Sequence, residues 1–346
     1  MFNKIKLIIL LCSFLLSSIP LKNKLLVPIY FDFGLSLGYN DNLFKFSDDE
    51  KESDGSYDYM GSASNYDSSI LKPDLKVFYS PQLLYDKVTN FILFSSLSKY
   101  PNIEDKNNIY YSLRFEYKIK PYSWIKLGYK NSTDNFLRYY TDGDLPEANY
   151  KCDYDSETIY ANYSMNFYPY GWTRFEISKN TQFFNPYFTE FDLEIFELSL
   201  THNYKYNLYS ISGKISSTVA DNISYKNGLN STEFDRSYNS IGMRLSIKRS
   251  LESFLKRITF GYDYNYRSYV SESELDALHA GRSHVENSFF IFMLKELRYN
   301  IDMELRYKFR YRKTNSDFEW VESLKSFTDN QIVIKFIYDM ELDLFY

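Results

Sequence analysis

Hydrophobic residues occupy every second position in the last stretch of the chain, QIVIKFIYDMELDLFY (331–346). Successive side chains of a β-strand point to opposite faces, so this alternation predicts a strand with one apolar face and one charged face. Strands of soluble sheets usually have about five or six residues, whereas a tilted strand needs roughly 9 to 11 to cross a bilayer. The apolar face consists of Ile332, Ile334, Phe336, Tyr338, Met340, Leu342, Leu344 and Tyr346.

The same alternation recurs along the chain and predicts about fourteen strands. It is cleanest in FDFGLSLGY (31–39), IYYSLRFEYKI (109–119), SIGMRLSIK (240–248), RITFGYDYNY (257–266) and YNIDMELRYKFRYR (299–312). Weaker examples are 70–79, 90–99, 123–130, 158–167, 172–181, 193–203, 208–217 and 287–296.

The expected connections alternate in length. Short ones fall near 80–88, 120–122, 168–171, 204–207, 249–256 and 297–298, and longer polar ones near 46–68, 101–108, 131–156, 182–191, 218–235, 270–286 and 313–330. Short periplasmic turns and long extracellular loops around an even number of strands are typical of outer-membrane barrels. The pattern predicts an all-β fold: a transmembrane antiparallel up-and-down β-barrel.

The cost of placing charge in lipid decides which face points outward. A basic side chain facing hydrocarbon at mid-depth costs roughly 2 to 4 kcal/mol, so the row Arg306, Lys308 and Arg310 must face the lumen. If both termini are periplasmic, Arg310 and Arg312 lie level with Lys335 toward the outside, and the acidic residues gather toward the periplasm. Alternatively, these charges pair across strands and only stabilise the wall. The candidate lumen and selectivity residues are Arg306, Lys308, Arg310, Arg312, Lys335, Asp302, Glu304, Asp339, Glu341 and Asp343.

The first twenty residues have the order of a secretory signal peptide. Lys4 and Lys6 precede an apolar run, and small Ser17 and Ser18 follow it. The expected organisation is a signal peptide over 1–20 and an outer-membrane β-barrel over 21–346. After cleavage Cys152 is the one remaining cysteine, so no intramolecular disulfide is available.

Composition agrees with a membrane barrel. The chain has 36 Tyr and 29 Phe, residues that favour the two interfaces of a bilayer. No stretch after the signal reaches about 18 apolar residues, so no membrane helix is predicted there. The net charge of -5 argues against nucleic acid as a partner.

These features resemble bacterial outer-membrane β-barrel proteins of Gram-negative bacteria, whose last strand ends in an aromatic residue recognised by the barrel-assembly machinery. By this resemblance Tyr346, with Leu344 and Leu342 before it, is the assembly signal. The stretch GLSLGYNDNLFKFS (34–47) is similar to the first strand of several porin-like and exopolysaccharide-associated barrels. The resemblance implies an outer-membrane location, with outer-membrane lipid, lipopolysaccharide and the assembly machinery as partners.

Fourteen strands tilted at about 40° imply a barrel roughly 28 Å across, wide enough for a small solute. We therefore expect a porin-like channel that passes small hydrophilic solutes, without cofactor or metal. The alternatives are a barrel that helps to export polysaccharide or surface protein, an adhesin, or an outer-membrane hydrolase. For a hydrolase, Asp276 and His279 are the visible acid and base pair, but an Asp and a His three residues apart in a loop are common, so no enzyme is predicted.

The acidic loop SDDEKESDGSYD (47–58) has many carboxylates, which hard cations such as Ca²⁺ prefer as ligands. Their spacing is irregular, so a solvated loop is the favoured interpretation and no metal site is predicted.

Overall fold

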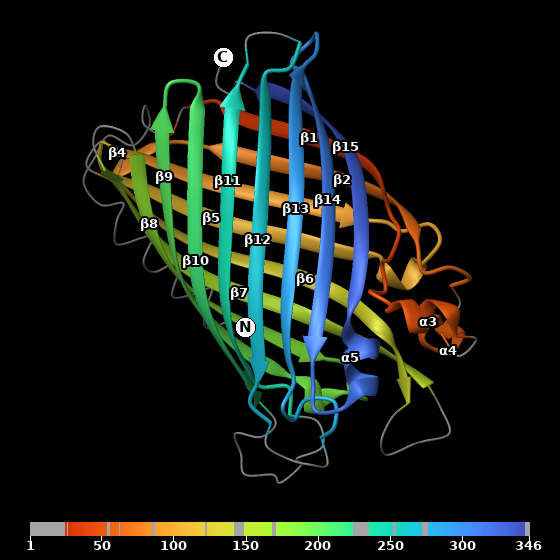
Figure 1. Ribbon diagram of the computed structural model, residues 1–346. Coiled ribbons are helices and arrows are strands. Elements are labelled where there is room, and N and C mark those ends of the chain that lie inside the picture. The colour runs from red at the N-terminus through yellow and green to blue at the C-terminus, as the bar shows by residue number, and fades with distance from the viewer. Residues whose placement is uncertain are drawn as a thin grey trace.

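The computed structural model describes residues 25, 27–53, 56–61, 63–84, 87–121, 123–141, 149–167, 171–223, 235–251, 254–271 and 276–342. Long antiparallel strands make up most of it (Figure 1). The strands are β1 (Ile29–Asn40), β2 (Ser68–Tyr79), β3 (Gln82–Leu84), β4 (Lys87–Ser98), β5 (Asn108–Lys120), β6 (Ser123–Thr141), β7 (Asn149–Phe167), β8 (Gly171–Phe184), β9 (Leu193–Tyr206), β10 (Tyr209–Asn222), β11 (Tyr238–Ser250), β12 (Arg257–Tyr269), β13 (Ser283–Glu296), β14 (Ile301–Asn315) and β15 (Phe327–Leu342).

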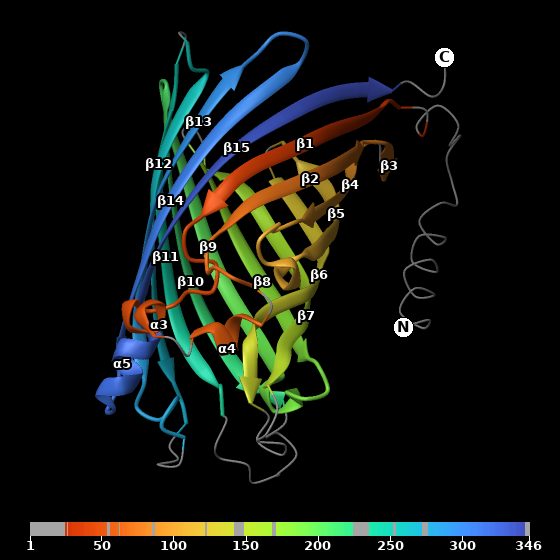
Figure 2. The ribbon, with the colours of Figure 1, turned by 90° about the vertical axis from the view of Figure 1, so that its right-hand side faces the viewer.

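Within the described residues, fourteen of these strands form a closed barrel, and short β3 adds to β4 beside it. Each barrel strand pairs with antiparallel neighbours, and β1 closes the ring by pairing with β15 along its whole length, from Ile29 opposite Leu342 to Asn40 opposite Gln331. Figure 2 shows β1 beside β15. Closure leaves no unpaired strand edge, as a sheet in lipid requires. The predicted fold class and strand number are confirmed.

The two ends of the barrel differ in their connections (Figure 1). At one end, here called the turn end, β9 and β10 are joined by residues 207–208 and β13 and β14 by 297–300. At the other, the loop end, the longer connections carry α3 (Asp48–Glu52), α4 (Ser56–Met60), α5 (Glu319–Lys325) and the 3-10 turns η1 (Glu104–Lys106) and η2 (Thr189–Phe191). The predicted alternation of short and long connections is confirmed.

The long loop predicted over 131–156 is wrong. Strands β6 and β7 continue into it, and only 142–148 separate them. The pairing of β6 with β7 shifts register between Ser132 and Asn135 and again between Phe136 and Arg138, and Asp134 adopts a positive φ of 55°. Such bulges insert extra residues and break the two-residue period, so the pattern of a strand is lost from the sequence.

The inner and outer faces follow the predicted parity. Outward-facing residues are apolar and well exposed, as a lipid-facing belt requires. Examples from four strands are Phe33, Leu35 and Leu37 of β1, Ile211, Ile215 and Val219 of β10, Tyr307 and Tyr311 of β14, and Ile332, Ile334 and Phe336 of β15. Most of the intervening residues are polar or small and face the interior.

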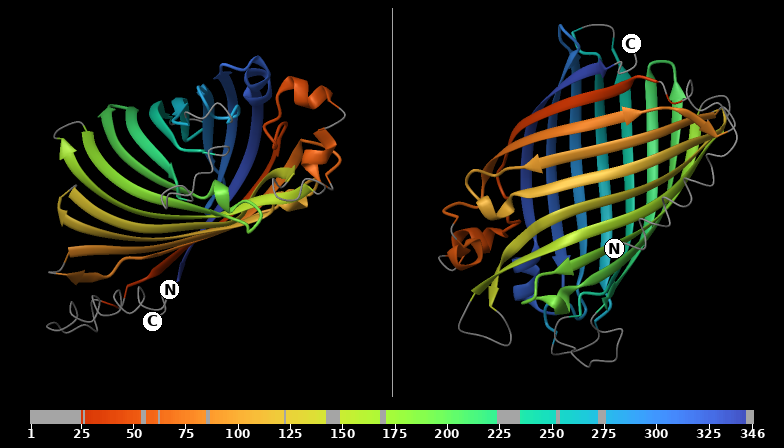
Figure 3. Two further views of the ribbon diagram at one scale, coloured as in Figure 1. Left: turned by 90° about the horizontal axis from the view of Figure 1, so that it is seen from below. Right: turned by 180° about the vertical axis from the view of Figure 1, so that it is seen from behind.

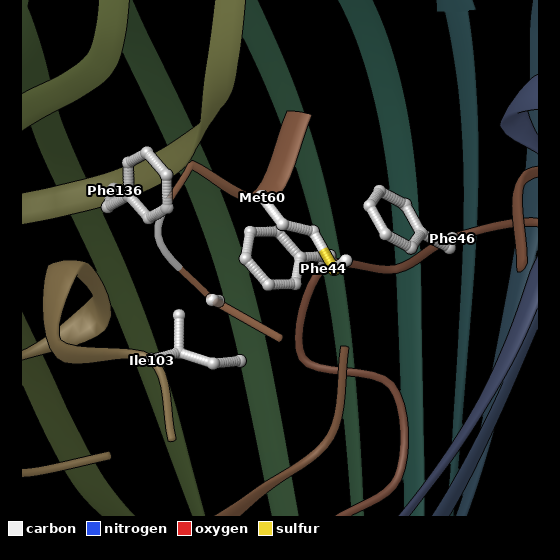
Figure 4. Packing of buried hydrophobic residues seen from close by; sticks show 6 residues of the cluster. Phe44, Phe46, Met60, Ile103 and Phe136 are labelled. Carbon is white, nitrogen blue, oxygen red and sulfur yellow. The ribbon is translucent and has the colours of Figure 1, made fainter. Parts of the chain in front are cut away.

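A small apolar core lies at the loop end rather than along the barrel. Phe44 and Phe46 follow β1, Met60 ends α4, Ile103 precedes η1 and Phe136 belongs to β6, and all are buried together (Figure 4). The rings of Phe44 and Phe46 stack with centroids 5.2 Å apart. This core attaches the β1–β2 loop (41–67) to the wall of the barrel.

Seen from the loop end, α3 and α4 lie beside α5 on one side of the ring (Figure 3). Among the described residues, no helix is long and apolar enough to cross a membrane. Cys152 is a free thiol, fully buried among aromatic residues of β7, β8 and the loop after β8.

Candidate functional site

Strands β14 and β15 of the lumen wall carry most of the candidate residues, and many of them are paired. The Nη2 of Arg312 donates to Glu286 at 2.6 Å, and Arg310 pairs with buried Asp329. The Nζ of Lys335 donates to Asp74 on β2 at 2.8 Å.

The prediction that Arg310 and Arg312 lie level with Lys335 is wrong. Lys335 lies opposite Glu304, while Arg310 lies opposite Asp329 and Arg312 opposite Phe327. Strands β14 and β15 both extend into the segment expected to be a loop, to Asn315 and from Phe327. A longer hairpin moves the register of every pair, because the connection sets which residues face each other.

Three carboxylates gather toward the turn end. Asp339 pairs in register with Asp32 of β1, and Asp302 is within electrostatic reach of it. The Nζ of Lys76 lies 2.5 Å from Asp32 and balances part of this charge. Glu304 does not join this group, because it pairs with Arg306 beside it.

The remaining candidate residues make few contacts or lie outside the described residues. Glu341 near the end of β15 accepts a hydrogen bond from Tyr30 at 3.4 Å. Lys308 lies on the inner face between Phe290 and Gln331. Leu342 is the last residue of β15, and Asp343, Leu344 and Tyr346 lie outside the described residues.

Other parts of the lumen wall carry charged clusters that were not singled out from the sequence. Glu116 on β5 lies 2.8 Å from Lys126 and 2.9 Å from Arg114. Arg244 pairs with Asp263 across β11 and β12, with Nη2 2.9 Å from Oδ2. The signal was available for these residues, because they occupy the polar positions of clean alternating segments.

The β1–β2 loop directs a lysine into the barrel. Lys45 has a positive φ of 57°, and Asn42 holds this turn by bonding the backbone N–H and carbonyl of Phe46. Its neighbours are charged residues of the inner wall: Arg310, Arg312, Glu286 and Asp329. Lys45 is nevertheless accessible to water, so the water that it meets lies inside the barrel. The surrounding protein, with the positive charges of Arg310 and Arg312, lowers the pKa of Lys45 to about 8.

A buried ion pair fastens this loop. Glu50 of α3 caps its own helix in a capping box with Ser47 and also pairs with Arg138 of β6. Arg138 donates to the carbonyls of Phe44 at 3.1 Å and Lys45 at 3.2 Å. The strand wall and the loop therefore share one hydrogen-bond network.

A second lysine approaches the same region from α5. Burial and the positive charges of Arg138 and Arg282 lower the pKa of Lys325 to about 7, partly offset by Glu50. Residues from β6, from the loop before β13 and from α5 therefore lie close together at the loop end. The charged residues converge here from segments far apart in the sequence.

Asp276 and His279 form a local pair. The Nδ1 of His279 lies 2.8 Å from Oδ1 of Asp276, and the backbone N–H of His279 donates to the same carboxylate at 3.1 Å. Burial lowers the pKa of His279 to about 4. In this arrangement the carboxylate of Asp276 closes the turn that contains both residues. Among the described residues, no group of three His, Cys, Asp or Glu side chains could hold a metal ion.

No family model and no curated protein sequence matches the chain. Solved outer-membrane channels do have a similar structure. The outer membrane channel DcaP of Acinetobacter baumannii has a TM-score of 0.50 and 11% identity, over 90% of this chain and 97% of that chain. The anion-selective porin from Comamonas acidovorans has a TM-score of 0.42 and 7% identity, over 90% and 98%. A bacterial polysaccharide outer membrane secretin has a TM-score of 0.42 and 8% identity, over 89% and 98%.

The likeness to DcaP is one of fold. It agrees with the strand ladder and with the division of faces. The chain has the fold of a porin-like outer-membrane β-barrel, as the sequence predicts.

Proposed function

We propose that the protein is an outer-membrane channel that passes small hydrophilic solutes. One observation carries the proposal: the barrel is closed, its outer face is apolar, and its inner face has charged side chains in contact with water. The side chain of Arg306 on the inner face is 43% exposed. A dry, filled barrel would leave such charges without solvation, at a high free-energy cost.

The likeness in fold to DcaP, an outer membrane channel, supports this proposal. In it the apolar belt contacts outer-membrane lipid, the loop end faces outward among lipopolysaccharide, and the barrel-assembly machinery inserts the chain. Catalysis has no part in the proposal, since Asp276 and His279 already bond to each other in a turn.

The wall residues divide into two groups in this proposal. Arg310, Arg312 and Lys335 have carboxylate partners and chiefly stabilise the wall. Lys308 forms no ion pair with any described residue, and Arg306 keeps much of its surface in water. These two side chains are the ones expected to meet a passing ion.

Conductance of the refolded protein in a planar bilayer tests the proposal. We expect a steady conductance. A thiol reagent that adds a bulky charge should reduce the current through Lys308→Cys, because position 308 faces the lumen. It should leave the current through Tyr307→Cys unchanged, because Tyr307 is exposed on the outer face. Native Cys152 is buried and does not compete.

Silence from a correctly folded barrel would overturn the channel and favour an adhesin, an export component or a hydrolase. Folding is checked by the shift in electrophoretic mobility that membrane barrels show on boiling. Equal modification effects at positions 307 and 308 would contradict the assignment of faces.

A further inference from the structure

Three arginines lie at the loop end on neighbouring segments of the wall. Arg236 precedes β11, Arg267 is near the end of β12, and Arg282 immediately precedes β13. Figure 1 shows β11, β12 and β13 side by side, with the start of β11, the end of β12 and the start of β13 at the loop end. None of the three is among the candidates predicted from the sequence.

Each guanidinium is held against an aromatic ring. The Cζ of Arg267 lies 3.8 Å from the ring centroid of Tyr238, and that of Arg282 lies 3.9 Å from that of Tyr269. The Cζ of Arg236 lies 5.0 Å from the ring centroid of Phe184 and 5.1 Å from that of Phe191. A ring stabilises a cation over its face without neutralising it, and it fixes the plane of the guanidinium. The N–H groups that do not bond the Tyr269 hydroxyl remain available for a ligand.

The arginines lack carboxylate partners in the part of the chain that the structure describes, while the hydroxyl of Tyr269 is a hydrogen-bond partner of Arg267 and Arg282. None of the three forms an ion pair with a described carboxylate, and the Nε atoms of Arg267 and Arg282 are buried without a hydrogen-bond acceptor. Arg282 as a whole is only 6% exposed. Buried polar groups in folded proteins nearly always have a partner, so these donors are arranged for a group that the described residues do not provide.

Three described carboxylates near this region are already engaged. Asp276 bonds His279, Glu286 pairs with Arg312, and Asp329 pairs with Arg310. Lys325 of α5 lies within electrostatic reach of Arg282 and adds a further positive charge, which the hydroxyl of Tyr269 offsets only in part. Positive charge therefore exceeds negative charge around the arginines among the described residues.

We propose that Arg236, Arg267 and Arg282 form a binding site for the carboxylate or phosphate group of an anionic solute at the loop end of the lumen. Guanidinium groups match these planar or tetrahedral oxyanions with two parallel N–H donors. The proposal rests on the proposed channel function, which brings the solute to the site. It names the substrate class as small organic or inorganic oxyanions.

The test measures block of the potassium chloride current by added succinate and, separately, by inorganic phosphate. Bilayers of phosphatidylcholine without lipopolysaccharide are used, so that no lipid phosphate occupies the site. We expect the double variant Arg267→Gln, Arg282→Gln to raise the half-blocking concentration at least about tenfold, because two charge-assisted hydrogen bonds are lost. The variant Arg267→Lys, Arg282→Lys keeps the charge and should lose several-fold affinity, because an ammonium cannot bind bidentately.

A matched control removes the same charge elsewhere in the lumen. Lys205 and Lys248 lie near the turn end, and Lys205→Gln, Lys248→Gln should change the half-blocking concentration less than about twofold, since the distance exceeds the screening length. Equal effects of the two Gln pairs would overturn the site in favour of a general positive field. A loss of succinate block in wild-type protein on adding lipopolysaccharide would assign the cluster to lipid phosphate and would also overturn it.

Calorimetric titration of succinate into the detergent-solubilised protein separates this inference from the channel itself. Binding that the Gln variant abolishes supports the site even if no current flows, whereas a conducting channel without anion binding refutes the site and leaves the channel intact. If the Gln variant does not show the mobility shift on boiling, the variant Arg267→Lys, Arg282→Lys is measured in its place. It keeps a cationic side chain beside the same aromatic rings.

Discussion

Lys45 shows how a single loop residue changes the interior of a barrel. Its left-handed backbone conformation and the bonds of Asn42 turn its side chain toward Arg310 and Arg312 on the wall. The protein thereby places like charges close together in water that it encloses. Lys325 approaches the same end from α5, so two lysines with depressed pKa values stand where a solute would enter.

These lysines predict a pH-dependent selectivity. Both are charged at pH 6, and each loses its positive charge as the pH rises through its pKa, about 7 for Lys325 and about 8 for Lys45. Anion preference, measured as the reversal potential in a potassium chloride gradient, should therefore fall between pH 6 and pH 9. Lys45→Met, Lys325→Met should flatten this profile, and Lys313→Met on the outer face should not. If the anion preference of the double variant still falls between pH 6 and pH 9, the change does not come from Lys45 and Lys325.

From the ion pair of Glu50 with Arg138 we expect the Glu50 carboxylate to hold the β1–β2 loop in place. Both side chains are nearly buried, and removing one partner of such a pair typically costs about 3 to 5 kcal/mol. Glu50→Gln should therefore increase hydrogen exchange over 42–60 and speed proteolysis there. Asp48→Asn on the same helix is the control, because the Asp48 side chain is 86% exposed and its pair with Lys51 is weak. Equal exchange in the two variants would contradict a role for the buried pair.

At the scale of the element, each strand combines two environments at alternate positions. In β10, Ile215 is 57% exposed on the outer face, and Ser216 beside it faces Ser199 and Gly242 across the inner face. In β6 the bulges near Asp134 interrupt this alternation, and the strand continues past them to carry Phe136 and Arg138 to the loop core. Strand ends therefore build the loop end of the barrel.

Adjacent positions in β10 should respond oppositely to a charge. Ile215→Lys places an ammonium toward acyl chains and should destabilise the folded barrel by roughly 2 to 4 kcal/mol, measured as a lower urea midpoint in lipid vesicles. Ser216→Lys places it in the lumen, where Gly242 leaves space, and should keep the wild-type midpoint. Similar midpoints for the two variants would show that these faces do not separate lipid from water.

At the scale of the whole molecule, the seam between β1 and β15 determines whether the ring closes. Gly38 of β1 lies at this seam, and a Cβ added there would stand 2.5 Å from the backbone carbonyl oxygen of Ile332. The close approach of the two strands leaves no room for a side chain. The first and last strands of the chain are thus matched to each other at the level of single atoms.

Gly38→Ala should weaken closure. The seam must open to accept the methyl group, at a cost of about 1 to 3 kcal/mol, which should lower the urea midpoint and the temperature at which the compact band is lost on electrophoresis. Gly213→Ala in β10 is the control, because its Cβ would meet only Leu245 at 3.6 Å, an ordinary contact. If Gly38→Ala and Gly213→Ala lower the stability equally, the loss comes from replacing any glycine in a strand and not from the seam.

The site could be predicted only in part from the sequence. The inward direction of Arg306, Lys308 and Arg310 followed from alternation alone. Arg267 continues the inward row of β12 by one residue, so a local signal for it existed. Arg236 and Arg282 lie in connections, where no period indicates where a side chain points. Their meeting depends on how three loops fold over one end of the barrel.

The sequence by itself determined the strands, their number and their two faces, because the choice between lipid and water is made residue by residue along each strand. It did not determine which charged residues pair with each other. Lys335 meets Asp74 from a distant strand, and Arg138 meets Glu50 across the loop end, because register accumulates through bulges, loop lengths and ring closure. Only the tertiary structure brings these contributions together, and so it alone decided which charges of the described wall have an ion-pair partner and which do not.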